Sequence, residues 1–329
     1  MGLDLYFVFG LSQCLIQSIT IIANVMTIIA FAKVRSLRIH TSNILIYVLS
    51  ITDLIWGLYV LIYYGVPFVF KLKPPLGEIG CMLTVLFEYV YSAGNMLLVA
   101  ITIDRLLMVS LDYSKYTKMQ TSRHFKMIIS GCFLYGFIGA LIELSLWNFA
   151  KKHYANAASI DFQTACMYPP RRMKWVGFYI SVCFFLVPIL LVGILSAVFF
   201  KRLRKRIHKT RQIGSISTVT GSIDANNESV SVADTASSDA GTNIGSVVRK
   251  RYIKPAVTLA ALVTSMLISM LPYCIYLFIS GFSEGLNVGV TYIMWLIIQL
   301  NPMLDPLFYA ATQKSLREFY RNKIRGMCR

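Results

Sequence analysis

Long uninterrupted hydrophobic stretches dominate the chain. They lie at residues 5–32, 43–65, 80–108, 125–148, 175–200, 255–281 and 290–312. A helix needs about 20 apolar residues to cross a hydrocarbon layer about 30 Å thick. Each stretch is long enough, and the apolar residues form blocks rather than the one-sided periodic pattern of soluble helices. The pattern therefore predicts an all-α membrane protein, a bundle of seven transmembrane helices.

Polar residues and prolines inside these stretches indicate how the helices pack. The third stretch is the least apolar, which is typical of a helix surrounded by other helices. Pro188, Pro272, Pro302 and Pro306 lie inside stretches. Neighbouring helices and waters can satisfy the carbonyl groups that such prolines leave without a partner.

The segments between and after the stretches divide the chain into four parts. Helices one to five with their loops occupy 1–200, a long loop 201–254, helices six and seven 255–312, and a tail 313–329. The long loop opens with the basic run KRLRKRIHKTR. Its residues 215–246 are rich in Ser, Thr, Gly, Ala and Asp, with too few apolar residues to fold, so disorder is expected there.

The tail alternates apolar and basic residues. Leu316, Phe319, Tyr320 and Ile324 are interspersed with Lys and Arg, which predicts an amphipathic helix on the inner leaflet, in contact with membrane lipids. Cys328 could carry a palmitoyl chain; a free thiol is an equal alternative.

Charge orients the helices. The chain has 32 Lys and Arg and a formal net charge of +17. Of these basic residues, 24 lie in the tail and in the loops on its side of the bundle, 7 lie on the opposite side, and Arg105 is inside the third stretch. Basic residues accumulate in cytoplasmic loops. We therefore expect an extracellular N-terminus and a cytoplasmic C-terminus in the plasma membrane, and no nucleic-acid partner.

Enzyme signatures are absent from the sequence. It has no GxxxxGK[ST] loop, no HExxH and no Cys/His cluster at zinc-ligand spacing, and its four histidines fall in loops. We therefore expect no enzymatic activity and no cofactor, apart from the ion considered below.

Ionisable groups inside a bilayer are costly, so each is a candidate functional residue. Those within the stretches are Asp53, Glu88, Asp104, Arg105, Glu143 and Asp305, apart from Lys126 at an edge. Glu143 belongs to no motif and is expected at the outer rim of the fourth helix.

Together these groups and several helix residues resemble the rhodopsin-like (class A) G-protein-coupled receptors, over nearly the whole chain. The matching positions, in chain order, are Asn24, Asp53, Cys81, Asp104-Arg105, Cys166, Pro188, Pro272-Tyr273, and Asn301 with Asp305-Pro306-x-x-Tyr309. The resemblance implies a receptor for an extracellular small molecule that acts on a heterotrimeric G protein. It assigns the activation switch to Asp104, Arg105, Asp305, Pro306 and Tyr309, and the extracellular disulfide to Cys81 and Cys166.

The chain departs from the family pattern at four places. Leu106 replaces the Tyr that usually follows Asp-Arg, Gly131 lies near the position of the usual Trp of helix four, and Met270 replaces the usual Trp of helix six. The interval from Cys81 to Arg105 is one residue shorter than usual. These departures concern activation and leave the fold unaffected.

Glu88 suggests the ligand class. It follows Cys81 by seven residues, where receptors for biogenic amines carry Asp, and the surrounding sequence resembles the muscarinic and histamine types. Tyr89, Tyr91, Tyr273 and Trp295 could face the same site. A carboxylate among aromatic rings suits an ammonium ligand. In the alternative, Glu88 is protonated or pairs with a basic residue of the second outer loop, such as Lys174. The chain would then be a peptide or lipid receptor, or an orphan receptor with an altered switch.

The resemblance also implies a sodium ion. Asp53, Asn301 and Asp305 could hold it with water in the middle of the bundle. A hydrated polar network without an ion would require the same residues.

Neighbouring classes are excluded by single features. A retinal-based light sensor needs a lysine in the seventh stretch, and 290–312 contains none. A transporter would show paired broken half-repeats, which this sequence lacks.

The first testable prediction is a disulfide between Cys81 and Cys166. Both thiols face the oxidising side in the expected topology, and a disulfide that closes so long a loop stabilises by about 2–4 kcal/mol. Peptide mapping of surface-expressed protein under non-reducing conditions should recover the linked pair. Recovery of both as free thiols would contradict the pairing.

Overall fold

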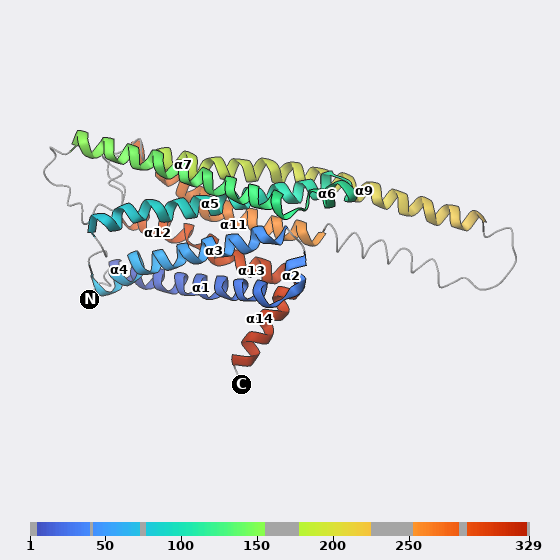
Figure 1. Ribbon diagram of the computed structural model, residues 1–329, viewed down its shortest axis with the longest axis horizontal. Coiled ribbons are helices and arrows are strands. Elements are labelled where there is room, and N and C mark those ends of the chain that lie inside the picture. Colours follow the sequence, from blue (N-terminus) through green and yellow to red (C-terminus); the bar gives the residue numbers. More distant parts are fainter. Residues whose placement is uncertain are drawn as a thin grey trace.

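The computed structural model (Figure 1) describes residues 5–39, 42–72, 77–154, 178–224, 253–282 and 288–327. Within these ranges the regular elements are all helices, and the long ones run side by side as one bundle. The predicted all-α helical bundle is confirmed.

Six helices in the described part are long and apolar enough to cross a membrane. The first is α1 (Leu5–Lys33), and the second runs from α3 (Asn43–Val60) through η1 (Leu61–Gly65) into α4 (Val66–Phe70). The third and fourth are α5 (Gly77–Ser110) and α7 (Ser122–Tyr154). The fifth comprises η2 (Ser181–Leu186) and α9 (Val187–Asp224), and the sixth is α11 (Lys254–Phe282).

The seventh predicted span is broken into α12 (Val288–Ile298) and α13 (Leu300–Thr312). The expectation of one unbroken helix over 290–312 is wrong at Gln299, which lies in a turn. The N–H of Gln299 donates to the carbonyl of Leu296 at 3.2 Å. Pro302 explains the break because it has no N–H to donate to the carbonyl of Ile298. The two halves together still provide the seventh crossing.

Two further prolines lie beside widened helical turns. The π-helical turn η1 precedes Pro67, and η2 precedes Pro188. A proline leaves the carbonyl four residues before it without its helical donor, and a π-helical turn is one way for a helix to accommodate the disruption.

Asparagine side chains from other helices donate to two of the carbonyl groups that prolines leave without a helical donor. Asn95 of α5 donates its side-chain N–H to the carbonyl of Phe184, four residues before Pro188, at 3.2 Å. Asn24 of α1 donates to the carbonyl of Pro302, four residues before Pro306, at 3.1 Å. The predicted satisfaction of proline-freed carbonyls by neighbouring helices is therefore confirmed at these two positions.

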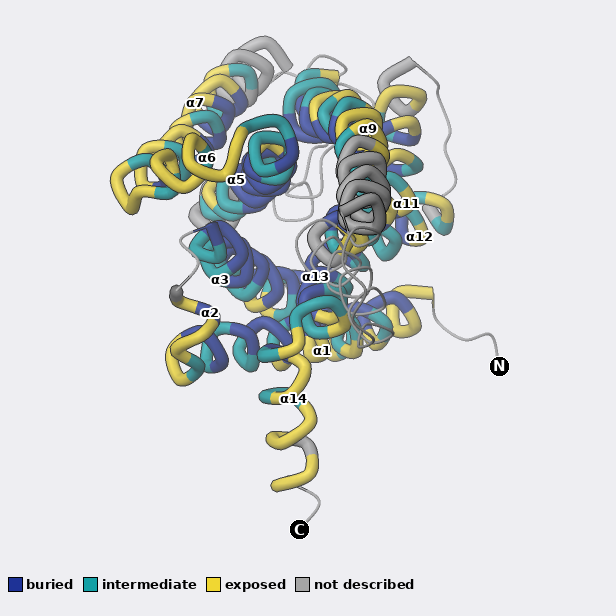
Figure 2. The backbone as a smooth tube through the Cα atoms, turned by 90° about the vertical axis from the view of Figure 1, so that its right-hand side faces the viewer, coloured by how far each residue is buried: buried dark blue, intermediate teal, exposed yellow. Residues whose placement is uncertain are grey.

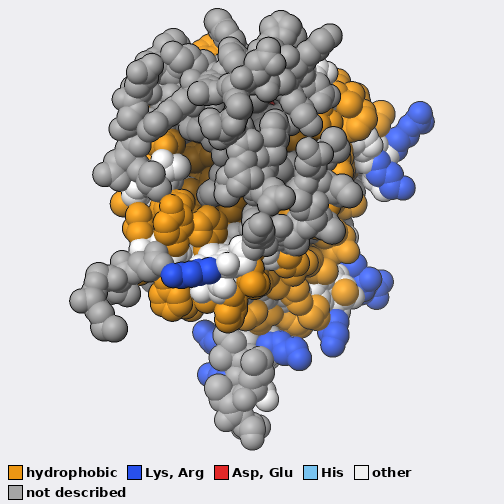
Figure 3. Space-filling view, turned by 90° about the vertical axis from the view of Figure 1, so that its left-hand side faces the viewer, with side chains coloured by type: hydrophobic (Ala, Val, Ile, Leu, Met, Phe, Trp, Pro, Cys, Tyr) orange, Lys and Arg blue, Asp and Glu red, His pale blue; other side chains and the backbone are white. Residues whose placement is uncertain are grey.

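Apolar side chains cover the outside of the bundle and polar side chains lie within it. Leu15, Ile22, Ile194 and Ile268 are each more than 60% exposed, and Figure 3, which looks onto one end of the bundle, shows hydrophobic side chains around its edge. In Figure 2 the buried faces of the helices turn inward. In a soluble protein such a surface would be an aggregation hazard, whereas in lipid it is the expected exterior.

Three short helices lie at the end of the bundle where α9 projects beyond the other long helices: α2 (Arg35–Ile39), α6 (Tyr113–Met119) and α14 (Lys314–Met327). The tail helix α14 is held by its apolar face. Leu316 is fully buried, and the hydroxyl of Tyr320 contacts the hydroxyl of Thr27 and donates to the carbonyl of Ala23, both at 2.7 Å. We call this end of the molecule the basic end, because the basic loops and tail lie there.

Helix α9 continues to Asp224 and includes the first residues of the segment 215–246, which we expected to be disordered. That expectation is corrected for residues 215–224. Once a helix has formed, each further residue adds a hydrogen bond without a new nucleation cost, so poor helix formers can extend it. The rest of the segment lies outside the described residues.

Close packing of α5 and α7 depends on a glycine. A methyl group at Gly136 would lie 2.7 Å from the backbone oxygen of Tyr89, whereas a methyl group at Gly131, on the same helix, would meet nothing within 4 Å. Small residues allow membrane helices to approach each other in this way.

The second prediction compares two identical substitutions. Gly136→Ala should lower the free energy of unfolding by about 1–3 kcal/mol, because the backbone of α5 cannot yield without repacking. Gly131→Ala should raise it by about 0.5–1 kcal/mol, because alanine favours the helix. Thermal unfolding of the two purified variants should shift in opposite directions. Equal shifts would show that α5 and α7 do not pack at this distance.

Candidate functional site

Glu88 lies among aromatic rings from three other spans. It is on α5, is 8% exposed, and is within electrostatic range of the phenol groups of Tyr64 and Tyr273. The ring of Trp295 lies 5.4 Å from that of Tyr64 and 5.9 Å from that of Tyr273. These three rings and the carboxylate form what we call the acid–aromatic cluster.

The second predicted span supplies a supporting layer. The hydroxyl of Tyr59 donates to Thr84 at 2.9 Å, and the Tyr59 ring stacks on Phe87, next to Glu88, at 4.3 Å. Tyr91 packs its ring 4.5 Å from Trp56. These contacts fix the face of α5 that carries Glu88.

Tyr89 is not part of this cluster, which corrects its predicted place beside Glu88. Its ring contacts Phe133 and Phe137 of α7, at 6.0 and 6.3 Å between centroids. Consecutive residues of a helix point about 100° apart, so Tyr89 faces α7 when Glu88 faces α3 and α11. Tyr91, Tyr273 and Trp295 lie on the same side of α5 as Glu88, as predicted.

A buried amide network, which sequence reasoning missed, borders the acid–aromatic cluster. Gln17 donates to Gln13 and to Gln299, both at 3.3 Å, and the indole N–H of Trp56 donates to Gln299 at 2.7 Å. All three glutamines are fully buried. Glutamines inside the first and seventh stretches were the available signal, because uncharged polar groups in lipid also require partners.

In the middle of the bundle, the predicted trio Asp53, Asn301 and Asp305 is buried, with exposures of 6%, 3% and 0%. The charge of Asp305 acts on Asp53, so the two carboxylates share one environment. Among the described residues, one oxygen of Asp53, one of Asn301 and both of Asp305 are buried without a hydrogen-bond donor.

These oxygen atoms fit a small hard cation. Carboxylate and amide oxygens are the ligands that such ions prefer, and two neighbouring buried carboxylates cannot both keep a negative charge without a cation or a proton. In the described part of the chain, no three His, Cys, Asp or Glu side chains converge. Sodium therefore suits this donor set better than a transition metal does.

Tyr309 connects the middle of the bundle with its basic end. It is 1% exposed and lies within electrostatic range of Asp53, Asp305 and Arg105. Pro306, three residues before it, is buried in the same helix. Tyr309 thus lies between the carboxylate pair and the end of α5 that carries Arg105.

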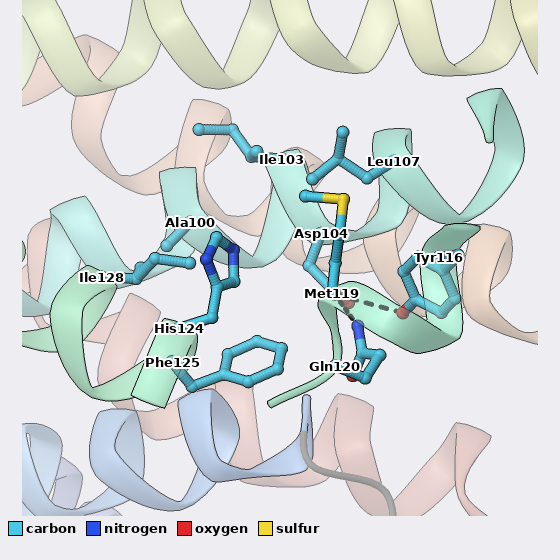
Figure 4. Close-up of a pocket in the computed structure, with 10 residues that line it drawn as sticks. All are labelled: Ala100, Ile103, Asp104, Leu107, Tyr116, Met119, Gln120, His124, Phe125 and Ile128. Carbon is cyan, nitrogen blue, oxygen red and sulfur yellow. Dashed lines mark hydrogen bonds between the residues drawn. The ribbon is translucent and has the colours of Figure 1, made fainter. Parts of the chain in front are cut away.

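At the basic end, Asp104 is bound by Tyr116 of α6 and by Gln120, which directly follows that helix. The carboxylate lies 3.6 Å from the guanidinium of Arg105 and accepts hydrogen bonds from Tyr116 at 3.1 Å and from Gln120 at 3.0 Å. Figure 4 shows both bonds. Burial, together with the neighbouring charge of Asp104, raises the pKa of the Tyr116 hydroxyl, which therefore stays protonated and donates.

Sequence reasoning missed Tyr116 because a seven-residue helix shows too little periodicity to reveal its inward face, and it missed Gln120 because that residue follows the helix and belongs to no periodic pattern. It also missed the arginines of α9. Arg202 donates to Ser110, and Arg206 donates to the carbonyl of Leu111 and pairs with Asp112 at 3.6 Å. The start of the long loop is thereby joined to the end of α5.

The departures from the family pattern have definite surroundings. Leu106 packs against an apolar cluster of α5, α9 and α11 that includes Val109, Phe199 and Leu259. Met270 is fully buried in the main core. Gly131 is exposed, so α7 has open space where the usual tryptophan is missing.

Glu143 is 2% exposed, so the expectation of a residue at the rim is wrong. It lies within electrostatic range of Tyr179, whose hydroxyl donates to the carbonyl of Gly139 at 3.1 Å. Glu143 is therefore enclosed between α7 and the start of the fifth span, apart from the acid–aromatic cluster.

Several predicted residues lie outside the described part. The structure does not describe Lys174, Cys166, Cys328 or the side chain of Cys81, so the disulfide and the palmitoyl site stay predictions. The cysteines whose side chains are described, Cys14, Cys132, Cys183 and Cys274, are free thiols.

The chain is similar to known membrane receptors. The model of the seven-transmembrane receptors of the rhodopsin family matches residues 23–309. Adenosine receptor A3 from Canis lupus familiaris is 23% identical over 311 residues, covering 94% of this chain and 88% of that protein.

Proposed function

We propose that this chain, which belongs to the rhodopsin family of seven-transmembrane receptors, binds a small extracellular amine beside Glu88 and activates a heterotrimeric G protein. As a member of this family it is a multi-pass membrane receptor and not an enzyme. The charge distribution supports an extracellular N-terminus, a cytoplasmic C-terminus and a place in the plasma membrane.

The acid–aromatic cluster is the observation that carries the amine proposal. Burial makes a carboxylate favour a cation close to it. Aromatic faces attract a cation within about 6 Å of the ring centre, and Tyr64, Tyr273 and Trp295 surround the position of Glu88. A primary or substituted ammonium group satisfies the carboxylate and the rings together.

A neutral nucleoside is the second candidate ligand. The similarity to an adenosine receptor supports it, and so does the amide network, since Gln299 and Gln17 offer both donors and acceptors beside Trp56. Such a ligand would stack on the rings and would not need the charge of Glu88. The charge of that residue therefore distinguishes the two candidates.

Signalling is proposed to proceed through Arg105. Ligand binding would favour an arrangement in which the cytoplasmic ends of α9 and α11 move outward and Arg105 leaves Asp104. Tyr116 and Gln120 retain Asp104 by two hydrogen bonds. They can therefore hold the carboxylate in place while Arg105 turns toward the G protein.

A sodium ion at Asp53, Asn301 and Asp305 would reinforce the resting arrangement. It would offset one of the two carboxylate charges and tie α3 to α13. The buried oxygen atoms without donors support this site. A hydrated polar network remains the alternative.

The third prediction tests the ligand class. A panel of small biogenic amines and adenosine is first screened by calcium and cyclic-AMP responses in cells that express the chain. Glu88→Gln should weaken binding of the active amine by at least about 30-fold, because loss of one member of a buried charge pair costs about 2–5 kcal/mol. Glu88→Asp should weaken it less. Radioligand saturation, normalised to surface receptor, measures both.

Glu143→Gln is the matched control, since it neutralises another buried glutamate apart from the cluster. It should leave amine affinity unchanged. Full affinity of Glu88→Gln would reject the amine. Adenosine activity that withstands Glu88→Gln would favour the nucleoside, and a response to neither would direct attention to peptide or lipid ligands.

The fourth prediction concerns signalling. Arg105→Ala should abolish G-protein activation, while surface expression and ligand affinity stay close to those of the unmodified receptor, because Arg105 lies at the basic end. Arg321→Ala, which removes an exposed arginine of α14, should signal normally. Nucleotide exchange at matched receptor density measures both. Normal exchange by the Arg105 variant would place the switch elsewhere.

A further inference from the structure

A cavity of about 240 Å³ lies between α5, α6 and α7 at the basic end. Figure 4 shows the side chains around it. Most of its wall is apolar and consists of Ala100, Ile103, Leu107, Met119, Phe125 and Ile128. The bound carboxylate of Asp104, with Tyr116, Gln120 and His124, forms the polar part.

The cavity is accessible from the outside of the bundle. Ile103 is 39% exposed although it belongs to a membrane-spanning segment, and Met119 of α6 is 36% exposed. In a membrane-spanning helix, an exposed isoleucine faces acyl chains rather than water. The cavity therefore opens toward lipid, close to the cytoplasmic surface in the proposed orientation.

Exposed cations lie beside the cavity. Lys118 immediately precedes the lining residue Met119, and Arg123 and Lys126 immediately flank His124 and Phe125, which also line the cavity. All three basic side chains are exposed. Each of the two nearby carboxylates lies 3.6 Å from an arginine guanidinium, Asp104 from that of Arg105 and Asp112 from that of Arg206. The rim therefore attracts an anion.

We propose that this cavity binds one acyl chain of an anionic phospholipid of the inner leaflet, whose headgroup contacts Lys118, Arg123 and Lys126. The volume is below the roughly 300 Å³ at which sites for drug-sized ligands begin, so it suits part of a chain and leaves the headgroup outside. Basic clusters next to membrane helices attract anionic lipids of the cytoplasmic leaflet.

Occupancy of the cavity would act on Asp104. A hydrocarbon chain against the wall excludes water from the hydrogen bonds of Tyr116 and Gln120, which are stronger in a medium of low dielectric constant. The lipid thereby fixes α6 against α5. Binding of the lipid does not depend on the identity of the extracellular ligand.

The fifth prediction is tested with the full chain in nanodiscs of phosphatidylcholine. The probe is phosphatidylserine with a photoreactive diazirine in its acyl chain, and the same diazirine in phosphatidylcholine is the reference. Peptides that contain residues 100–107 and 116–128 should be labelled preferentially by the phosphatidylserine probe. Unlabelled phosphatidylserine should compete better than unlabelled phosphatidylcholine.

Two variants test headgroup and cavity separately. Lys118→Gln/Arg123→Gln should weaken competition by phosphatidylserine about 30-fold, since each basic residue near an anionic surface contributes about 1 kcal/mol. Ile103→Trp should reduce labelling of both regions several-fold, because the larger ring fills the cavity from its opening. Thermal unfolding verifies that each variant is folded. If one of the two variants does not fold, the other still tests the proposal.

Matched controls separate the site from general surface attraction. Lys201→Gln/Lys205→Gln removes two exposed charges of α9. Ile142→Trp makes the same substitution at a 42% exposed isoleucine of α7. Ile142 lies about 21 Å along the helix from the cavity residue Ile128. Both should leave the labelling unchanged. Equal labelling by the two probes, or equal effects of variants and controls, would overturn the proposal.

Discussion

The requirement that every backbone N–H and C=O be bonded inside the protein governs this structure, because hydrocarbon offers no substitute. Prolines in the fifth and seventh spans break that rule locally. Asn95 and Asn24 repair it by donating to the carbonyls of Phe184 and Pro302. Each repair links two helices, α5 to the fifth span and α1 to α13. The irregular turns that shape the interior are thereby held in fixed positions.

The same requirement, applied to side chains, arranges the candidate functional groups along the bundle. Glu88 lies in the acid–aromatic cluster, Asp53 and Asp305 share the middle, and Asp104 is bound at the basic end. Tyr309 is within electrostatic range of both the carboxylate pair and Arg105. Charges in low dielectric interact over longer distances than in water. A change in ligand charge at one end can therefore bias the arrangement at the other.

The departures from the family pattern are informative in this context. Leu106 contributes to an apolar contact among α5, α9 and α11 and offers no hydrogen bond. The Asp104 carboxylate is held instead by Tyr116 of α6 and by Gln120, which follows that helix. The segment between α5 and α7 is thus a structural component of the proposed switch, and the lipid-facing cavity lies directly against it.

The sequence by itself determined the helical class, the positions of the spans and the polar positions within them, because lipid imposes a length and a composition on every crossing. It also identified Glu88, Asp53 and Asp104 as candidates, since ionisable groups are costly there. Only the tertiary structure decided which faces meet. It placed Tyr89 against α7, buried Glu143 and broke the seventh span at Gln299. It also brought Gln17 to Gln299, far along the chain, and Gln120 to Asp104 of α5. Lipid and the protein interior are equally apolar, so a membrane-spanning helix does not need a hydrophobic stripe along one side. Which side of each helix faces its neighbours is therefore set by packing and hydrogen bonds between helices, and no local sequence pattern reveals it.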